Sequence, residues 1–316
     1  MENSSSSCDL HLPVRSISLP TRIHPTSVKL ESALNHLKTW QISCPVIIGA
    51  EMLQNGLVGL AEMYNCMEEF INSSTQTQQA LLRHGNGQLV EEALDKSVTL
   101  IDTCSSARDL LLTMKENVQA LQSTLRRRRG SGDYSSIENE IASYIACRKK
   151  MKKDISKSLQ ALKKLEIKNK TTVVDHHQHD LSFTIKVLGE STAITISIFR
   201  SLLIFVSMPA KLSGWSLISK LMKTRLSSSS DDHHHHQKMI NQVESVDFAV
   251  HSLLGSSRSS STTSSSSNND KASEVNMTQK MLLGLSVSIE GLETGLDSMF
   301  KCLVHNRVSF LNILAN

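Results

Sequence analysis

The sequence predicts an all-α fold: a bundle of long antiparallel helices with a disordered N-terminal tail and linkers rich in Ser and His. Three observations favour this class. No stretch alternates apolar and polar residues as a half-buried strand does. Apolar residues instead recur every three or four positions over long segments, as on one face of a helix. The connections between these segments are short, which favours antiparallel packing of neighbouring helices.

The first helices are marked by proline and by capping residues. Residues 1–25 are rich in Ser and Pro and are expected to be a disordered lead-in. A helical pattern begins after Pro25 and ends just before Pro45, because proline disfavours helix in the preceding residue. A second helix is predicted over about residues 47–71. The sequence NSST at residues 72–75 then indicates a stop followed by an N-cap.

The clearest helix follows the sequence HGNG at residues 84–87. Its ten stripe positions are all apolar and are separated by steps of three or four: Leu94, Val98, Ile101, Cys104, Ala107, Leu111, Met114, Val118, Leu121 and Leu125. Arginines close this helix, and GSG at residues 130–132 breaks it. The next helix is predicted to start at Ser135 or Ser136, and Arg148 interrupts its apolar stripe.

Residues 187–209 form the most apolar segment of the chain. A membrane-spanning helix needs about 20 mostly apolar residues, and Glu190 and Arg200 divide this segment into short uncharged pieces. We therefore predict a buried core helix here and not a membrane span. A shorter helix is expected to follow, to about residue 226.

The predicted organisation is a helical bundle over residues 26–226 followed by four smaller parts. These are a helical island (237–254) between two low-complexity linkers (227–236 and 255–270), and a C-terminal helix (271–316) that packs on the bundle.

The C-terminal helix carries a strict heptad seam. Its members are Leu282, Leu285, Ile289, Leu292, Leu296, Met299 and Leu303. The register continues to Asn306, a polar seam residue of the kind that fixes register and partner. Gly284, Gly291 and Gly295 weaken the helix, so we expect close approach of a neighbouring helix there. Whether the seam packs within the chain or between two chains stays open.

Charge is unevenly distributed along the chain. The net charge is +4, yet residues 121–170 hold fourteen Lys and Arg against five Asp and Glu, a local +9. The six cysteines are far apart, with no CxxC pair, which indicates free thiols in a reducing compartment. The N-terminal sequence MENSSSSCDL does not resemble a secretory signal.

No pattern of catalytic residues is found. The sequence lacks a GxSxG elbow, a glycine-rich phosphate loop and an HExxH helix. We therefore predict that the chain is not an enzyme and needs no cofactor. The histidine tracts at residues 175–180 and 231–236 hold competent metal ligands, but they lie in hinge or linker sequence. They are interpreted as low-complexity sequence, and no metal is expected.

Two basic clusters form a predicted helix hairpin. Four interpretations remain open: a solvated helix face, a site for an anionic membrane or acidic protein surface, a nuclear import signal, and a nucleic-acid site. The last has least support, because few aromatic residues lie nearby for base stacking. The basic residues are Arg126, Arg127, Arg128, Arg129, Arg148, Lys149, Lys150, Lys152 and Lys153.

The lead-in contains RSISLP at residues 15–20. With Ser18 phosphorylated, Arg15, Ser18 and Pro20 are similar to the ligand motif of 14-3-3 proteins, which bind phosphoserine through an arginine cluster. Two alternatives remain: prolines that stiffen the chain and delimit the first helix, and a plastid transit peptide.

Four ordered segments give the chain a family resemblance. They are RSISLPTRIHP, LDKSVTLIDTCSSARDLL, the pair LRRRR and RKKMKK, and LVHNRVSFLNIL. Together they resemble the plant-specific BYPASS-like family, a domain of unknown function linked to root and shoot development. The resemblance implies a mostly helical, non-catalytic plant protein and supplies no active-site residues. The histidine tracts and the long serine linker depart from the family pattern.

These observations lead to a functional hypothesis with alternatives. We expect a non-enzymatic helical interaction or scaffold protein with a role in plant root and shoot development and with protein partners still to be found. The first alternative is a peripheral membrane regulator that binds anionic lipid through the basic hairpin. A carrier or enzyme that uses the bundle interior is the second. An intracellular, cytoplasmic location is predicted, with the nucleus, plastid and membrane periphery left open.

Overall fold

The computed structural model describes residues 25–43, 48–73, 75–83, 87–127, 135–171, 179–207, 241–258 and 268–315. These residues form eight helices and no strand, which confirms the all-α prediction. The helices are α1 (Pro25–Ile42), α2 (Ala50–Ser73), α3 (Thr75–Arg83), α4 (Gln88–Arg127), α5 (Ser135–Thr171), α6 (His179–Ser207), α8 (Gln242–Arg258) and α9 (Asn268–Ala315).

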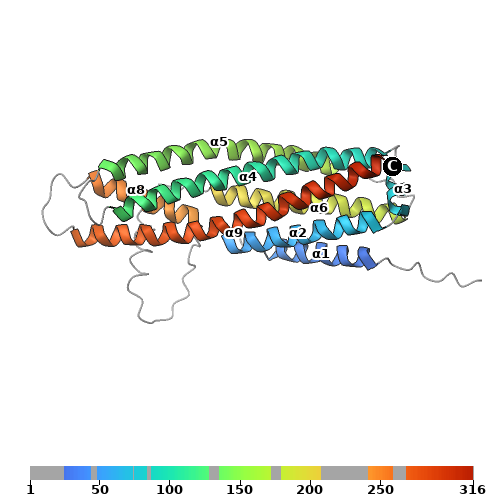
Figure 1. Cartoon of the computed structure of the whole chain (residues 1–316), viewed down its shortest axis with the longest axis horizontal. Coiled ribbons are helices and arrows are strands. Elements are labelled where there is room, and N and C mark those ends of the chain that lie inside the picture. Colours follow the sequence, from blue (N-terminus) through green and yellow to red (C-terminus); the bar gives the residue numbers. More distant parts are fainter. Residues whose placement is uncertain are drawn as a thin grey trace, which may run out of the picture.

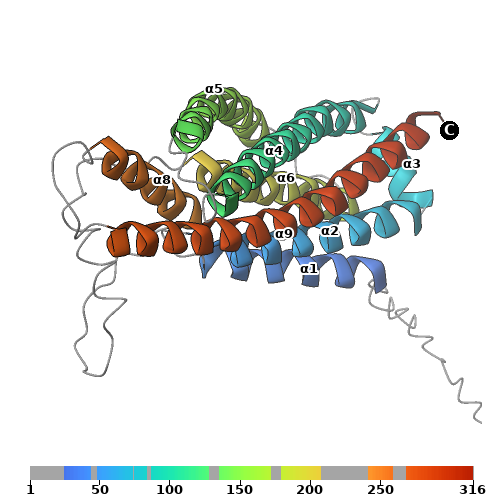
Figure 2. The same cartoon turned by 60° about the vertical axis from the view of Figure 1, so that its left-hand side comes forward.

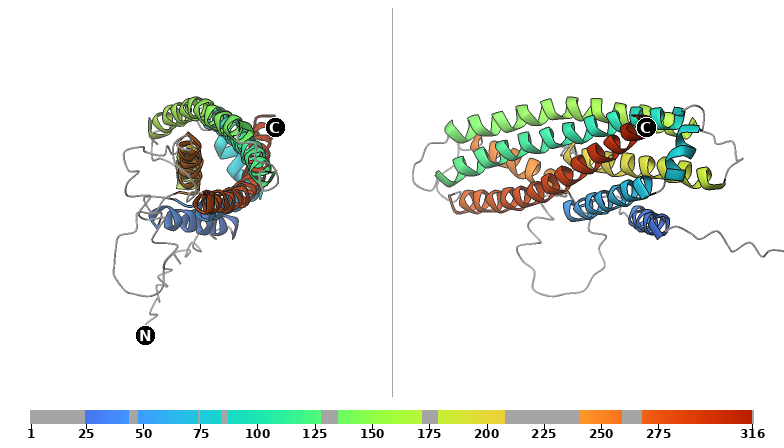
Figure 3. Two further views of the ribbon diagram at one scale, coloured as in Figure 1. Left: turned by 90° about the vertical axis from the view of Figure 1, so that its left-hand side faces the viewer. Right: turned by 45° about the vertical axis from the view of Figure 1, so that its right-hand side comes forward.

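The helices form one elongated bundle (Figure 1). The three longest, α4, α5 and α9, run along its length, with α1 and α2 on one side (Figures 1 and 2). Viewed along the bundle axis, the helices are arranged around a common interior, and α8 lies at the end where α9 begins (Figure 3). α9 packs against both α2 and α4, so the C-terminal helix is part of the main core.

The antiparallel packing predicted for helices joined by a short connection holds for α4 and α5, where Asn117 bonds to Cys147 and Lys96 bonds to Asn169. α4 and α9, which are not consecutive in the chain, are antiparallel as well. Cys104 Sγ donates to the Leu296 carbonyl over 3.6 Å, and Arg307 Nη1 donates to the Leu94 carbonyl over 2.5 Å. Residue numbers therefore rise along α4 as they fall along α9. α2 runs parallel to α9, which is possible because these two helices are not consecutive in the chain.

The apolar stripe predicted for α4 faces the interior, with one exception. Val98 is 42% exposed, while Leu100 and Thr103 are buried in its place. α4 packs near its start against α6 as well as α9, and this second neighbour moves the buried face away from the predicted line.

The heptad seam of α9 lies in the core of its own chain. All seven seam residues are at most 1% exposed, which leaves none of them to form an interface with a second chain. Asn306, in the continued register, donates from Nδ2 to the Tyr64 carbonyl of α2 over 2.8 Å. The polar seam residue thus joins α9 to α2 within one chain, and the question left open by the heptad pattern is answered.

Two of the three glycines in α9 allow close approach of α2. A Cβ at Gly295 would lie 3.0 Å from Leu57 Cδ1, and one at Gly291 would overlap the side-chain amide of Gln54. The expectation of close approach is therefore confirmed at these positions. It is wrong at Gly284, where an added Cβ meets no atom within 4 Å.

α6 is the most apolar of the described helices. Within the described residues one segment, Leu181–Ser207, is long and apolar enough to cross a membrane, with a mean hydropathy of 1.4. Of this helix's most apolar window, 56% is buried inside the bundle, against α1, α2, α4 and α5. Its polar groups also bond to those neighbours, as when Thr195 Oγ1 pairs with the Tyr64 hydroxyl at 3.1 Å. These contacts agree with the predicted core helix.

Cys104 provides a chemical test of this packing. Its side chain is fully buried between α4 and α9, and burial raises the pKa of the thiol to about 12. The reactive thiolate is therefore suppressed in the folded state. We expect iodoacetamide at mildly alkaline pH to label Cys104 only through unfolding, as measured by mass spectrometry of the peptide that contains it. Labelling as fast in buffer as in denaturant would contradict the packing.

The raised pKa of the Cys104 thiol also makes the free energy of unfolding depend on pH. The folded pKa of the Cys104 thiol lies above its ordinary value of 9.0. The unfolded chain therefore loses this proton first as the pH rises. The stabilisation that Cys104 gives is complete below about pH 9 and is lost as the pH rises from there toward 12.

Candidate functional site

The main surface feature of the described residues is a row of lysines on α5. They project from the helix face opposite the one that carries buried Met151, Ile155 and Leu162. Each residue of an α-helix is rotated by about 100° about the helix axis from the one before, so these lysines all lie within roughly 160° of the helix circumference. This surface, termed here the lysine face, consists of nine exposed residues: Lys149, Lys150, Lys152, Lys153, Lys157, Lys163, Lys164, Lys168 and Lys170.

Two carboxylates border the lysine face. Asp154 pairs with Lys157 at 2.9 Å, and Glu166 pairs with Lys170 at 3.1 Å and with Arg200 of α6 at 2.5 Å. Hydrogen bonds from Arg200 and Lys170 lower the pKa of the Glu166 carboxyl. None of the ion pairs found in the described part of the chain involves Lys149, Lys150, Lys152, Lys153, Lys163 or Lys164. The face therefore keeps a strong positive charge.

The two predicted basic clusters do not form one patch. Arg126 and Arg127 are exposed at the end of α4, whereas Arg128 and Arg129 lie outside the described residues. Asn117 of α4 bonds to Cys147 of α5 at 3.1 Å. Because α4 and α5 are antiparallel, this contact places Arg126 about 16 Å along the axis from the first residue of the lysine face, at 1.5 Å per residue.

Arg148 was predicted to belong to the basic surface, and this prediction is wrong. The side chain is buried, with 5% of the residue exposed. Its Nε and Nη2 donate to the two carboxylate oxygens of Asp247 in α8 at 3.0 and 2.9 Å, and Nη1 donates to the Val206 carbonyl at 2.7 Å. The physical reason is helical spacing, because position 148 falls on the inward stripe of α5.

Arg148 belongs to a buried polar network that joins α5, α6 and α8. Tyr144 donates its hydroxyl to Asp247 Oδ1 at 2.8 Å. Burial, followed by the Asp247 charge, raises the pKa of Tyr144 well above its ordinary value. Burial disfavours the Arg148 charge, but Asp247 more than offsets this and raises the guanidinium pKa. All the donors are directed inward, so the network holds α8 in place and presents nothing to a ligand.

Asn241 completes the attachment of α8. Its Oδ1 accepts from the Val243 amide at 2.6 Å as an N-cap, and its Nδ2 donates to the Phe205 carbonyl of α6 at 2.8 Å. The start of α8 and the end of α6 are thereby tied together.

The remaining sequence motifs are not brought into this region. Arg15, Ser18 and Pro20 lie outside the described residues, as do residues 231–236 and most of the first histidine tract. Among the described residues, no group of three His, Cys, Asp or Glu could hold a metal ion. The proposed phosphoserine docking motif stays a prediction.

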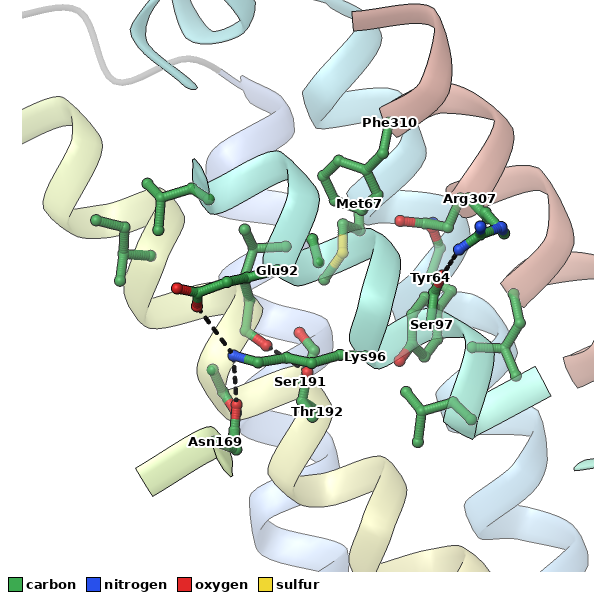
Figure 4. A pocket seen from close by; sticks show the side chains of 18 residues that line it. Tyr64, Met67, Glu92, Lys96, Ser97, Asn169, Ser191, Thr192, Arg307 and Phe310 are labelled. Carbon is green, nitrogen blue, oxygen red and sulfur yellow. Dashed lines mark hydrogen bonds and ion pairs between the residues drawn. The ribbon is translucent and has the colours of Figure 1, made fainter. Parts of the chain in front are cut away.

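One structural feature was not anticipated from the sequence. A cavity of about 90 Å³ lies where α2, α4, α6, α9 and the end of α5 meet (Figure 4). Lys96, Asn306 and Arg307 contribute polar groups to its wall. In the sequence, the one indication of this cavity is Asn306, a polar residue at a position of the heptad seam.

Comparison with known proteins identifies the family. A family model described as "Protein BPS1" matches residues 56–313, from α2 to near the end of α9. No match was found among curated proteins or among solved structures. Because the family model covers most of the chain, including the bundle core and the lysine face, the chain belongs to the BPS1 family, the BYPASS-like family that its sequence resembles.

Proposed function

We propose that this chain is a non-enzymatic helical interaction protein of plant development, acting in the cytoplasm and docking onto an acidic surface through the lysine face. The family connects the chain to development by its name. The observation that carries the docking proposal is the one-sided gathering of nine exposed lysines on α5.

The burial of the heptad seam strengthens this choice. A seam that is already buried between α2 and α4 cannot also hold a partner chain without opening the core. The lysine face is available, because its side chains point away from the bundle. From Lys149 to Lys170 it extends over about 32 Å at 1.5 Å per residue, long enough to engage several acidic groups at once.

An anionic membrane is the second candidate for the acidic surface. A straight row of lysines on the edge of a bundle can meet a flat surface along its whole length. Each lysine close to anionic lipid contributes about 1 kcal/mol, and salt screens this attraction. Ile167, 58% exposed, is the large apolar residue among these lysines. Membrane binding through this face would therefore be electrostatic and shallow.

Charge reversal tests both candidates. A variant with Lys149, Lys150 and Lys153 changed to Glu is compared with one carrying the same change at Lys186, Lys280 and Lys301. The control lysines are exposed on α6 and α9, so the two variants have equal net charge. Binding is measured by cosedimentation with phosphatidylcholine vesicles, with and without phosphatidylserine, over a salt series, and by affinity purification from plant tissue.

We expect the α5 variant, and not the control, to lose binding. Salt-sensitive sedimentation with phosphatidylserine vesicles that only the α5 variant loses would identify the membrane. A protein partner that only the α5 variant loses, without vesicle binding, would identify an acidic protein surface. If reversal on α5 changes neither measurement, the lysine face is a solvated helix surface and the docking proposal fails.

A further inference from the structure

The outer face of α4 carries an evenly spaced row of carboxylates. Asp95, Asp102, Asp109 and Glu116 recur at intervals of seven residues, and all four are exposed. None of the ion pairs found in the described part of the chain involves them. This row, termed here the acidic stripe, extends over about 32 Å at 1.5 Å per residue. It therefore matches the lysine face of α5 in length and is opposite to it in charge.

Two large apolar side chains lie along the acidic stripe. Val98 stands between the first two carboxylates and Leu112 between the last two, and they are 42% and 51% exposed. A seven-residue repeat with apolar residues at the intervening positions is typical of a helix face that packs along another helix. Because these residues are exposed, no described helix covers the outer face of α4.

Two contacts show how the acidic stripe and the lysine face are aligned. α4 and α5 lie side by side along the bundle (Figure 1). Asn117 Nδ2 bonds to Cys147 Sγ at 3.1 Å, and Lys96 Nζ bonds to Asn169 Oδ1 at 3.3 Å. Residues of α4 and α5 at the same height along the bundle therefore have numbers that add up to about 264.

This relation places the two charged rows at the same height. The acidic stripe, residues 95–116, lies beside about residues 148–169 of α5, and the lysine face covers residues 149–170. The outer surface of α4 and α5 thus presents a negative row and a positive row that run side by side and begin and end together.

Such a surface is self-complementary under a twofold axis parallel to the bundle. This axis places α4 of one chain over α5 of the other at unchanged height, and it repeats the same contact on the other side of the axis. Glu116 is then level with Lys149, and Asp102 is level with Lys163. Val98 is level with Ile167, the exposed apolar residue of the lysine face. A twofold axis across the bundle would instead bring like charges together.

We propose that the lysine face binds the acidic stripe of a second copy of this chain, so that two chains form a twofold-symmetric dimer through α4 and α5. The inference rests on the docking function proposed above and names the acidic surface. A strip about 32 Å long and two helices, or about 20 Å, wide covers roughly 640 Å² of each chain, close to the ~800 Å² per partner of a stable interface.

The dimer is expected to be sensitive to salt. Each exposed ion pair contributes little by itself, and salt screens it. Sedimentation equilibrium of the full chain measures the dissociation constant. We expect a dimer that dissociates when the salt is raised from about 0.05 to about 0.5 M.

Charge reversal tests each row separately. In the α4 variant, Asp102, Asp109 and Glu116 are changed to Lys. The control has the same change at Glu31, Glu51 and Glu62, which are exposed on α1 and α2, so that its net charge is equal. In the α5 variant, the six lysines of the face that take part in no ion pair are changed to Glu: Lys149, Lys150, Lys152, Lys153, Lys163 and Lys164.

Each reversed variant alone should dimerise at least about tenfold more weakly, because like charges then face one another. The control should dimerise like the unmodified chain. An equimolar mixture of the α4 and α5 variants should regain the lost association, since opposite charges face again in both contacts of the mixed pair. Far-UV circular dichroism establishes that each variant is folded.

A cross-linking experiment tests the alignment without changing any charge. A chain with Val98→Cys is mixed with a chain carrying Ile167→Cys, and a short bismaleimide is added. The engineered pair should cross-link between chains, as identified by mass spectrometry of the joined peptides. Leu112→Cys replaces Val98→Cys in the control, because position 112 is about 22 Å away from Ile167 along the axis at 1.5 Å per residue.

The outcomes distinguish this inference from the docking function. A salt-sensitive dimer that both reversals weaken and their mixture restores, with the Val98–Ile167 cross-link, supports the proposal. A chain that stays monomeric at low salt but binds vesicles or another protein through α5 leaves the docking function standing and overturns the dimer. A dimer that survives both reversals uses another surface, and equal cross-linking from positions 98 and 112 contradicts the alignment. Either result also overturns the proposal.

Discussion

A chain carrying Leu292→Asp and Leu296→Asp is expected to unfold rather than to become a soluble, less associated protein. Both leucines are fully buried in the seam of α9. Truncating a buried leucine to alanine already costs about 2–5 kcal/mol, and a buried carboxylate without a partner adds a desolvation cost. Two such changes approach or exceed the roughly 5–15 kcal/mol that stabilises a whole domain. Far-UV circular dichroism and urea denaturation measure the loss.

The same helix supplies the control. Leu283 and Val287 are 55% and 62% exposed, on the outer face of α9. Changing both to Asp adds the same charge to the same helix, yet each should alter the free energy of unfolding by no more than about 0.5 kcal/mol. A stably folded inner variant with altered self-association would show that the seam acts between chains.

Removing the charge of Arg148 has the second largest expected effect. Arg148→Met leaves Asp247 buried without its counter-charge, at 9% side-chain exposure. Breaking a buried ion pair in this way costs about 3–5 kcal/mol. The double variant Arg148→Met, Asp247→Leu removes both charges and should recover most of that loss, because an apolar pair avoids the desolvation penalty. Urea denaturation of the single and double variants gives the coupling free energy between the two sites.

Lys149→Met is the control for this cycle. It lies one position along α5 but is exposed on the lysine face. Its effect on the free energy of unfolding should stay within about 0.5 kcal/mol. Equal destabilisation by Arg148→Met and Lys149→Met would contradict the buried network.

Helical periodicity predicted which faces are buried but not which neighbour covers them. The heptad of α9 marked Leu292 and Leu296 as buried residues, since spacing alone determines the face of a helix. It could not distinguish a second chain from α2 and α4, because both would bury the same stripe. Val98 shows a second limit of periodicity. The pattern of α4 predicts that this residue is buried, but its exposure depends on where α6 lies and not on α4 itself.

The misassignment of Arg148 has a specific cause. Grouping it with Lys149 and Lys150 relied on proximity in sequence, whereas its position on the apolar stripe pointed inward. Asp247 likewise occupies an apolar stripe, in the predicted island. Opposite charges at two such inward positions are a usable signal for a buried pair. Pairing residues that are 99 positions apart, however, depends on how α5 and α8 meet.

The cavity was beyond sequence analysis for the same reason. Lys96 and Arg307 look like ordinary surface residues on amphipathic helices, and their convergence depends on the crossing of five helices. Asn306 was visible as a polar seam residue, yet only the structure shows that one of its two polar atoms is left without a partner.

The position of α9 also bears on how the chain folds as it is synthesised. α2 is complete at Ser73, but the helix that covers it begins only at Asn268. At about 5–20 residues per second, roughly 10 to 40 s of translation separate the two. During this interval the apolar faces of α2 and α4 lack their main cover, so the nascent chain is a natural client for chaperones that shield hydrophobic surface until α9 emerges.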